Sequence, residues 1–187
     1  MTPARTEFDR PTGEFIEQAH GAVAPITLCR PTVADGAALW RIARDSRTLD
    51  LNSPYSYLLW CRDYADTTVV ARRDGEAVGF VTGYRRPERP EVLMVWQVAV
   101  DESCRGEGLA GRMLDHLTER LRGAGVRVME TTITPDNTAS RRLFAGYAAR
   151  QGAELERSVL FSAEDFPGGE GAGHLAEELH RIAPIAG

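Results

Sequence analysis

The alternation of apolar and polar residues predicts regular structure from about residue 26 onward. Residues 26–29 form a short apolar run typical of a strand, and residues 35–46 place apolar side chains three and four positions apart, as a helix with one buried face requires. Residues 1–25 mix proline, glycine and charge without sustained periodicity. We therefore expect a mobile or loosely docked tail followed by a folded region that opens with a strand and a helix.

A second helix is expected over residues 54–64. Ser53 can accept a hydrogen bond at the helix start, and Pro54 suits the first helical position because that residue needs no backbone donor. The aromatic and sulfur-containing side chains of this segment recur on one helical face, which predicts that the face belongs to the core. Its members are Tyr57, Trp60, Cys61 and Tyr64.

Residues 67–71 and 77–84 are two strand-like runs that flank the dipeptide Asp74-Gly75. This dipeptide favours the positive backbone angles of a tight hairpin turn, so we expect an antiparallel pair. The charged, proline-containing residues 85–91 are expected to form a surface loop. They lead to the apolar run of residues 94–100, which completes a meander of three consecutive strands.

The order of elements then changes to helices alternating with strands. A helix ending near Arg122 separates the central strand from residues 126–133, so these two strands should lie parallel, joined by a right-handed crossover. After Pro135, either Asp136 or Asn137 can cap a helix that runs to about residue 151. This helix presents apolar side chains on one side, namely Ala139, Leu143, Phe144 and Tyr147. Residues 154–161 form the next strand, and residues 174–182 show a weaker strand pattern.

The expected fold is therefore α/β, with a mixed central sheet that begins as an antiparallel meander, continues as a parallel pair and is flanked by helices. The chain has 187 residues, enough for one domain with a proper core but not for two ordinary ones. We assign residues 26–187 to this single domain and residues 1–25 to the tail.

Composition and charge exclude several classes of function. The formal net charge of −5 argues against a nucleic-acid partner, which would demand a basic surface. The sequence contains no lysine, which excludes Schiff-base chemistry and pyridoxal phosphate. No segment has the apolar length of a signal peptide or a membrane span. The cysteines Cys29, Cys61 and Cys104 lack a metal-binding or disulfide pattern, so we expect packing residues, no metal and a cytoplasmic location.

Candidate chemistry begins between the central strand and the helix that follows it. Arg105, Gly106 and Gly108 leave the backbone amides at the helix start unshielded, so an anion can reach several N–H donors at the positive end of the helix dipole. A nucleoside-triphosphate P-loop is excluded because its lysine is missing. The loop therefore predicts a site for the phosphates of another ligand.

Two glycine-rich patterns overlap in this loop. Gly106, Gly108 and Gly111 satisfy the dinucleotide fingerprint, and Glu130 follows at the distance expected for a ribose-binding carboxylate. However, that fingerprint requires the glycines directly after the strand, and here residues 101–105 intervene. Three antiparallel strands also precede the loop, so a dinucleotide-binding domain does not fit.

The other pattern is R-x-x-G-x-A, formed by Arg105, Gly108 and Ala110, followed by a helix, a parallel strand and N-x-A-x-x-x-L-F starting at Asn137. These features resemble the GCN5-related N-acetyltransferases. In that superfamily the loop binds the pyrophosphate of an acyl-coenzyme A (acyl-CoA), and the preceding strand splays from its parallel neighbour to receive the pantetheine arm. The resemblance implies acetyl-CoA as co-substrate, held by residues of the strand, loop and next helix. These are Val98, Val100, Arg105, Gly106, Gly108, Leu109, Ala110 and Asn137.

Five further blocks, in one order, narrow the resemblance to the diaminobutyrate acetyltransferases of ectoine biosynthesis. They are LDLNSPYSYLL, VGFVTGY, VWQVAVD, TTITPDNTASRRLF and H-x-x-E-x-x-x-R-I. Membership would imply acetyl transfer to the 4-amino group of L-2,4-diaminobutyrate, a role in osmoadaptation and a homodimer. Two alternatives stay open: a protein or peptide N-acetyltransferase, and a non-catalytic acyl-CoA-binding module.

Such a diamine requires an acidic pocket, and the blocks that carry the resemblance supply its candidate residues. These are Asp50, Asn52, Tyr55, Trp96, His174 and Glu177. We expect Asp50 and Glu177 to hold the ammonium groups and Glu177 to remove the proton, with the backbone amides of Gln97 and Val98 stabilising the oxyanion. The superfamily often places a tyrosine where this chain has Phe144, so Tyr55, Tyr147 or water would protonate the thiolate. Each of these residues could instead have a purely structural role. The loop residues could cap the helix, Trp96 could pack in the core, and His174 and Glu177 could lie in a solvated tail.

Overall fold

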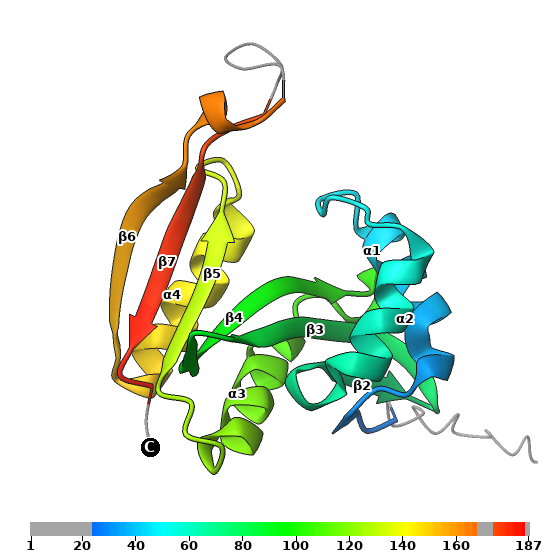
Figure 1. The fold of residues 1–187 in the computed structure, drawn as a ribbon. Helices are drawn as coiled ribbons and strands as arrows, with labels where there is room; N and C mark the ends of the chain where they lie inside the picture. The colour runs from blue at the N-terminus through cyan, green and yellow to red at the C-terminus, as the bar shows by residue number, and fades with distance from the viewer. Residues whose placement is uncertain (1–23, 168–173, 186–187) are drawn as a thin grey trace, which may run out of the picture.

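The computed structural model describes residues 24–167 and 174–185. The predicted tail therefore lies almost entirely outside the described residues. Within them the chain forms one seven-stranded sheet with helices on both faces (Figure 1). The predicted fold class, a mixed sheet in an α/β arrangement, is confirmed.

The first half of the sheet is antiparallel. It contains β1 (Thr27–Cys29), β2 (Val69–Arg73), β3 (Glu76–Arg86) and β4 (Arg89–Val100), each paired with the next. The turn between β2 and β3 has positive φ at Asp74 (53°) and Gly75 (82°), as the sequence predicted.

The prediction of a surface loop over residues 85–91 is wrong. β3 and β4 continue through most of that segment, and only Pro87 and Glu88 form the turn. Arg85 pairs with Leu93, and the guanidinium of Arg85 donates to the carbonyl of Pro90 at 2.8 Å. Proline is tolerated here because the strand ends at the margin of the sheet, where a missing donor costs little.

The second half of the sheet contains β5 (Val128–Ile133), β6 (Glu154–Phe161) and β7 (Glu177–Ala183). β5 pairs with β4 in parallel, as predicted from the intervening helix. The last strand inserts between β5 and β6, so the order across the sheet is β1-β2-β3-β4-β5-β7-β6.

Within the described residues four α-helices cover the sheet, and two of them lie on each face. Helices α1 (Gly36–Ser46) and α2 (Pro54–Asp63) pack on one face of the antiparallel half. Helices α3 (Leu109–Arg122) and α4 (Thr138–Gln151) pack on the other face, α4 behind β5 to β7 (Figure 1). Single 3-10 turns at Val33–Asp35, Ala65–Thr67, Glu102–Cys104 and Ala163–Asp165 link the elements.

The predicted apolar faces are only partly core. Tyr57 and Cys61 of α2 are buried, but Tyr64 at its end is 43% exposed, so its assignment to the core is wrong. Trp60 is half-buried and stacks on Trp96 and Tyr84 rather than entering the core. In α4, Phe144 and Tyr147 are buried as predicted, whereas Ala139 in the first turn is exposed.

Candidate active site

The sheet opens between β4 and β5. Their parallel pairing covers only Val92–Val95 of β4 and Val128–Thr131 of β5. From Gln97 to Val100, β4 pairs with β3 alone among the described strands. Figure 1 shows the two halves of the sheet diverging from this point, so that β5, β6 and β7 form one arm of a V and β2, β3 and β4 the other.

A β-bulge in β4 lies at the start of the opening. Thr82 pairs with Gln97 and Gly83 pairs with Val95, so Trp96 is an extra residue without a partner on β3. A bulge reverses the alternation of side chains along a strand. Val95 accordingly packs in the core beneath α3 and α4, whereas the side chain of Gln97 lies toward α2.

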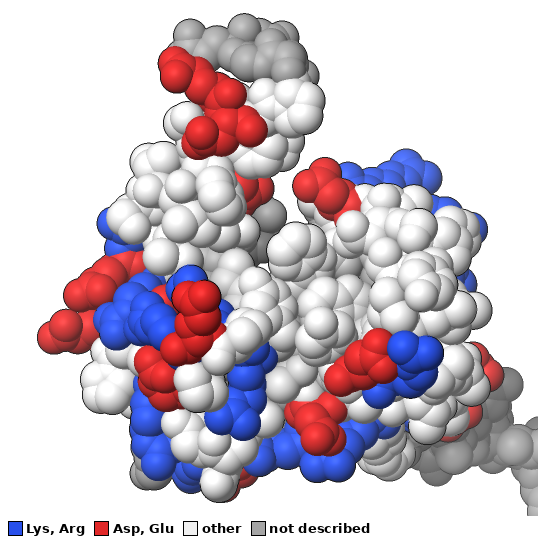
Figure 2. All heavy atoms as spheres, viewed as in Figure 1, with Lys and Arg blue, Asp and Glu red and all other residues white. Residues whose placement is uncertain are grey.

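A cavity of about 470 Å³ occupies the V. One wall comes from the loop between α1 and α2 together with β4, and the other from the end of β5, the start of α4 and the residues before and at the start of β7. Figure 2 shows the hollow between these two parts of the surface, with mostly uncharged walls and acidic residues near its rim. The lining residues are Thr48, Leu49, Asp50, Asn52, Trp96, Gln97, Thr132, Ile133, Thr134, Asp136, Asn137, His174, Leu175 and Glu177.

Gln97 ties the loop that carries Asp50 to the sheet. Its side-chain Oε1 accepts a hydrogen bond from the Tyr57 hydroxyl at 3.0 Å, and its Nε2 donates to the carbonyl of Asp50 at 2.9 Å. Gln97 is only 6% exposed, and burial also raises the pKa of Tyr57, so both groups depend on these bonds to offset their desolvation. The side chain of Gln97 therefore fixes the loop, which leaves its backbone as the candidate oxyanion donor.

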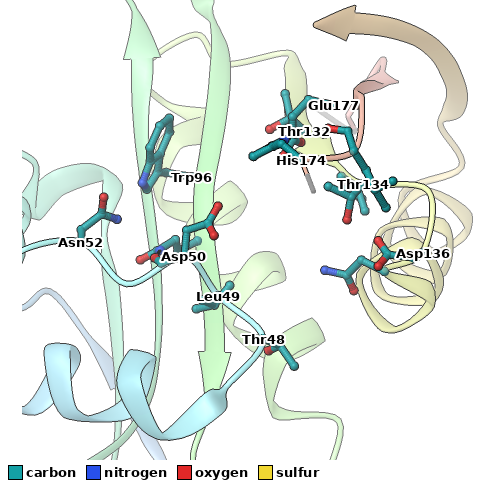
Figure 3. Close-up of a pocket in the computed structure, with 14 residues that line it drawn as sticks. Thr48, Leu49, Asp50, Asn52, Trp96, Thr132, Thr134, Asp136, His174 and Glu177 are labelled. Carbon is teal, nitrogen blue, oxygen red and sulfur yellow. Dashed lines mark hydrogen bonds between the residues drawn. The ribbon is translucent and has the colours of Figure 1, made fainter. Parts of the chain in front are cut away.

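Asp50 and Glu177 face each other across the cavity (Figure 3). Burial is the main cause that raises the pKa of the half-buried Glu177 carboxyl, and the negative charge of Asp50 raises it further. A hydrogen bond with the Thr132 side chain and the nearby His174 ring act in the opposite direction. A carboxylate with a raised pKa beside a second carboxylate is suited to accept a proton from a bound ammonium group.

Two aromatic stacks hold other residues of the walls. Trp96 is 50% exposed and stacks on Trp60 of α2 with ring centroids 6.4 Å apart. The ring of His174 stacks on Phe166 at 3.6 Å, and its Nδ1 lies 2.7 Å from the carbonyl oxygen of Leu175. Stacking removes rotational freedom from each ring, so both present a fixed surface to a ligand.

The predicted phosphate loop has the backbone that close approach of an anion requires. Gly106 and Gly108 have φ of 81° and 70°, and a Cβ atom on either would meet nothing within 4 Å. Glycine is therefore required for backbone conformation rather than for space. The side chain of Leu109 is buried in the core, so only its backbone amide can contribute to binding of the phosphates. Ala110 follows it in the first turn of α3. Val98 and Val100 lie half-buried along β4.

Asn137 connects the two sides of the site. Its Oδ1 accepts a hydrogen bond from the amide of Ser140 at 3.0 Å, so of the two capping residues that the sequence offered it is Asn137 that caps α4, and the residue also lines the cavity. The helix that follows is therefore anchored at the edge of the V by a residue that a bound ligand can touch.

Two tyrosines considered for thiolate protonation occupy very different positions. Tyr147 is fully buried, its hydroxyl lies 2.6 Å from that of Thr118, and burial raises its pKa to about 12. It packs between α3 and α4 and is not positioned to act in the cavity. Tyr55 is 66% exposed in the first turn of α2 and is absent from the cavity lining.

The structure also reveals lining residues that were not predicted from the sequence to belong to the site. Thr132, Thr134 and Asp136 lie at the carboxyl end of β5 and in the loop after it. The sequence could have indicated them, because they form a run of polar residues at the end of a predicted buried strand, where open α/β sheets bind ligands. Glu130 on the same strand has a structural role instead, because it is 2% exposed and pairs with Arg86 at 2.9 Å and Arg89 at 3.8 Å.

Within the described parts of the chain, no group of three or more His, Cys, Asp or Glu side chains is arranged to hold a metal ion. None of the helices in residues 24–167 and 174–185 combines the length and apolar character that a membrane span requires.

Comparisons with known proteins agree with this geometry. The model of the Acetyltransferase (GNAT) family matches residues 37–147. The chain is 58% identical to an L-2,4-diaminobutyric acid acetyltransferase from Streptomyces avermitilis, over 100% of this chain and 99% of that protein. It is 43% identical to a protein of the same name from Halalkalibacterium halodurans, over 92% of this chain and 93% of that one.

Among solved structures, the fold matches the diaminobutyrate acetyltransferase EctA from Paenibacillus lautus, in complex with its substrate L-2,4-diaminobutyric acid and coenzyme A. The TM-score is 0.81 at 42% identity, covering 88% of this chain and 98% of that one. A structure of yncA, a putative acetyltransferase from Salmonella typhimurium with acetyl-CoA, shares the fold at a TM-score of 0.67 and 18% identity, over 88% of this chain and 96% of that one. The chain therefore belongs to the GNAT acetyltransferase family and, within it, to the L-2,4-diaminobutyric acid acetyltransferases.

Proposed function

We propose that this protein transfers the acetyl group of acetyl-CoA to the 4-amino group of L-2,4-diaminobutyrate, giving N4-acetyl-L-2,4-diaminobutyrate for ectoine biosynthesis and so for osmoadaptation. The observation that carries the proposal is the pair of carboxylates, Asp50 and Glu177, in one cavity at the opening between β4 and β5. The substrate named in the relatives carries two ammonium groups, which such a pair complements.

The two carboxylates have different tasks in this proposal. Asp50 is exposed at the rim and holds the 2-ammonium group by charge. Glu177 lies deeper and takes a proton from the 4-ammonium group, directly or through water, because its raised pKa brings its basicity closer to that of an amine. Trp96, Asn52 and His174 shape the walls around the carbon chain and the substrate carboxylate.

In the transfer step, the amine nitrogen attacks the thioester carbonyl, so that an N–C bond forms and the C–S bond breaks, and the nitrogen releases a second proton to solvent as the amide forms. The electron pair of the C–S bond leaves on sulfur. The backbone amides of Gln97 and Val98, next to the bulge, donate to the developing oxyanion. Tyr55 or a water molecule protonates the thiolate. Tyr55 can do so only if its exposed side chain turns toward the cavity when the ligands bind.

The test is a measurement of thiol release from acetyl-CoA with 2,4-diaminobutyrate, ornithine, lysine and peptide acceptors, followed by NMR of the product. We expect the fastest turnover with 2,4-diaminobutyrate and acetylation at N4. Turnover with peptides alone would favour a peptide N-acetyltransferase. Binding of acetyl-CoA without turnover of any acceptor would favour a non-catalytic module, and either result would overturn the proposal.

We also propose that the protein is a cytoplasmic homodimer whose acetyltransferase domain comprises residues 26–187. The free thiols of Cys29, Cys61 and Cys104 suit a reducing compartment. Support for the dimer comes from the edge strand β6, on which Val159, Leu160 and Phe161 are exposed. An apolar sheet edge of this kind is usually covered in a folded protein.

A further inference from the structure

A second cavity of about 520 Å³ lies at the other end of the exposed part of β4. It is formed by the carboxyl-terminal part of α1 on one side and by the end of β4 and the beginning of the phosphate loop on the other. The lining residues are Arg41, Ile42, Asp45, Ser46, Arg47, Val100, Asp101, Glu102 and Arg105.

The two cavities follow one another along the same two elements. The first is lined by Thr48 to Asp50 of the loop after α1 and by Trp96 and Gln97. The second is lined by five residues between positions 41 and 47 and by Val100. A strand rises by about 3.3 Å per residue, so Val100 lies roughly 10 Å along β4 from Gln97. A thioester donor that reacts at Gln97 and extends along β4 therefore runs toward the second cavity.

The acids of the second cavity are largely neutralised by internal partners. Asp101 accepts a hydrogen bond from Arg41 at 2.8 Å, and Asp45 accepts one from Arg44 at 2.8 Å. These bonds are the first cause of the lowered pKa of each carboxyl, so both stay ionised and paired. The guanidinium of Arg41 is itself occupied, since it also donates to the carbonyl of Ala77 at 3.1 Å.

Two other guanidinium groups in the cavity are not matched in this way. Among the described residues, Arg47 has neither a hydrogen bond nor an ion pair, and Arg105 donates only through Nε to the carbonyl of Val100 at 3.4 Å. Glu102 is the remaining carboxylate in the lining. The cavity thus offers the exposed side chain of Arg47 to an anion, on the wall opposite Arg105 of the phosphate loop.

The backbone of Arg47 is also unusual. It ends α1 with φ of 56° and ψ of 12°, a left-handed conformation that costs a residue with a Cβ free energy and is normally occupied by glycine or asparagine at a helix end. A left-handed arginine is the kind of backbone outlier from which a role for the side chain can be inferred.

We infer that the second cavity binds the 3′-phosphate of the coenzyme A moiety, with Arg47 as the residue that recognises this phosphomonoester. The pyrophosphate stays on the loop at Arg105, Gly106 and Gly108, and Arg47 approaches from the opposite wall. The inference rests on the proposed donor, acetyl-CoA, and adds a distinction between it and 3′-dephospho-acetyl-CoA, which has the same pyrophosphate and thioester.

The test compares the two donors in steady-state kinetics for the wild type and Arg47→Gln. We expect the wild type to prefer acetyl-CoA in kcat/KM by about tenfold or more, the contribution of one charge-assisted hydrogen bond pair. Arg47→Gln should raise KM for acetyl-CoA by that factor and leave kcat, the KM for the diamine and the KM for the dephosphorylated donor unchanged. Arg62→Gln, an exposed arginine on α2 paired with its neighbour Asp63, is the matched control and should preserve the preference.

Arg105→Gln separates the two phosphate sites, because loss of a pyrophosphate contact should weaken both donors alike. An equal effect of Arg47→Gln on both donors, or a wild type that does not distinguish them, would overturn the inference. Calorimetric titration with coenzyme A and with 3′-dephospho-coenzyme A measures the same preference without turnover. A failure of the proposed acceptor chemistry would therefore remain distinguishable from a failure of this inference.

Discussion

At the scale of single residues, the candidate active site contains two carboxylates whose burial and electrostatic surroundings differ. Glu177 is half-buried beside Thr132 and has a raised pKa, whereas Asp50 is exposed on a loop. Pairs of acids whose environments differ in this way commonly divide proton transfer and charge stabilisation between them. This asymmetry is the reason for the proposed roles of Glu177 as base and Asp50 as anchor.

Glu177→Gln tests the base directly. The substitution keeps the shape and hydrogen-bonding capacity of the side chain but removes its basicity, so we expect kcat to fall by about 10²- to 10⁴-fold at saturating substrate. Glu154→Gln, which removes one exposed carboxylate at the start of β6, is the matched control and should leave kcat unchanged. If Glu177→Gln turns over at the wild-type rate, Glu177 is not the base.

The pH profile supplies an independent test of the same residue. Because the pKa of Glu177 is raised, its basic form is lost as the pH falls through a value above the ordinary pKa of glutamate. We expect the midpoint of the acidic limb of kcat/KM to lie at a pH above that ordinary pKa and the limb to disappear in Glu177→Gln. An acidic limb that survives in the variant would assign it to another group.

The same raised pKa also affects stability. Since this carboxyl binds its proton more tightly in the folded state, the linked contribution to stability is present at low pH and declines as the pH rises through the raised pKa.

At the scale of elements, the bulge at Trp96 and the hydrogen bonds of Gln97 connect β4 to the loop that carries Asp50. Tyr57→Phe removes the donor to Gln97 Oε1 and leaves a buried acceptor without its partner. We expect a loss of about 1–3 kcal/mol in unfolding free energy and a several-fold higher KM for the diamine, because the loop at Asp50 is held less firmly.

The KM for acetyl-CoA should stay unchanged in this variant, which separates loop positioning from a general loss of structure. Tyr64→Phe, at the exposed end of the same helix, is the matched control and should alter neither stability nor KM. Equal rises in both KM values for Tyr57→Phe would argue against a role confined to the acceptor side. The measurements are denaturant unfolding and steady-state kinetics with each substrate varied in turn.

The phosphate loop offers a comparison in which backbone conformation is the only variable. Gly108 and Gly75 both have positive φ, 70° and 82°, and a Cβ on either meets nothing within 4 Å. Replacement by alanine should cost each about 1 kcal/mol through strain alone. We expect only Gly108→Ala to raise KM for acetyl-CoA, since Gly75 lies in the remote β2–β3 turn. Similar KM values for the two variants would show that the loop does not require this conformation.

Elements specified by local sequence could be predicted, whereas those set by distant pairing could not. The hairpin turn at Asp74-Gly75, the cap at Asn137 and the helix after the phosphate loop each follow from a few adjacent residues. The bulge at Trp96 depends on the register between β3 and β4, which single-strand periodicity does not contain.

The same distinction explains the site residues. Asp50, Trp96, His174 and Glu177 were expected to surround one pocket because of their sequence blocks, and they line one cavity in the structure. Tyr147 was considered because of its spacing from Phe144, but its burial against Thr118 depends on how α3 and α4 pack. Which side of a helix faces a cavity is set by tertiary contacts, so spacing alone was insufficient.

At the scale of the whole molecule, the V shape leaves the arm of β5, β7 and β6 with one uncovered edge. β6 is exposed along nearly its entire length and pairs only with β7 among the described strands. The polar residues of this strand lie near its start, and Val159, Leu160 and Phe161 lie at its end. Because the cost of leaving this apolar surface in water favours its burial, the proposed homodimer should form around β6.

Val159→Glu tests this arrangement, since Val159 is 63% exposed and a charge there would be desolvated in an interface. We expect sedimentation velocity to show a dimer for the wild type and a monomer for the variant, with unchanged circular dichroism as evidence of folding. Glu154→Gln also changes charge by one unit on the same strand and should remain dimeric. A dimeric Val159→Glu variant would move the interface away from β6, and a monomeric wild type would contradict the dimer itself. If the variant is monomeric yet retains wild-type kcat and KM, each copy contains a complete site, as the lining of the cavity by one chain predicts.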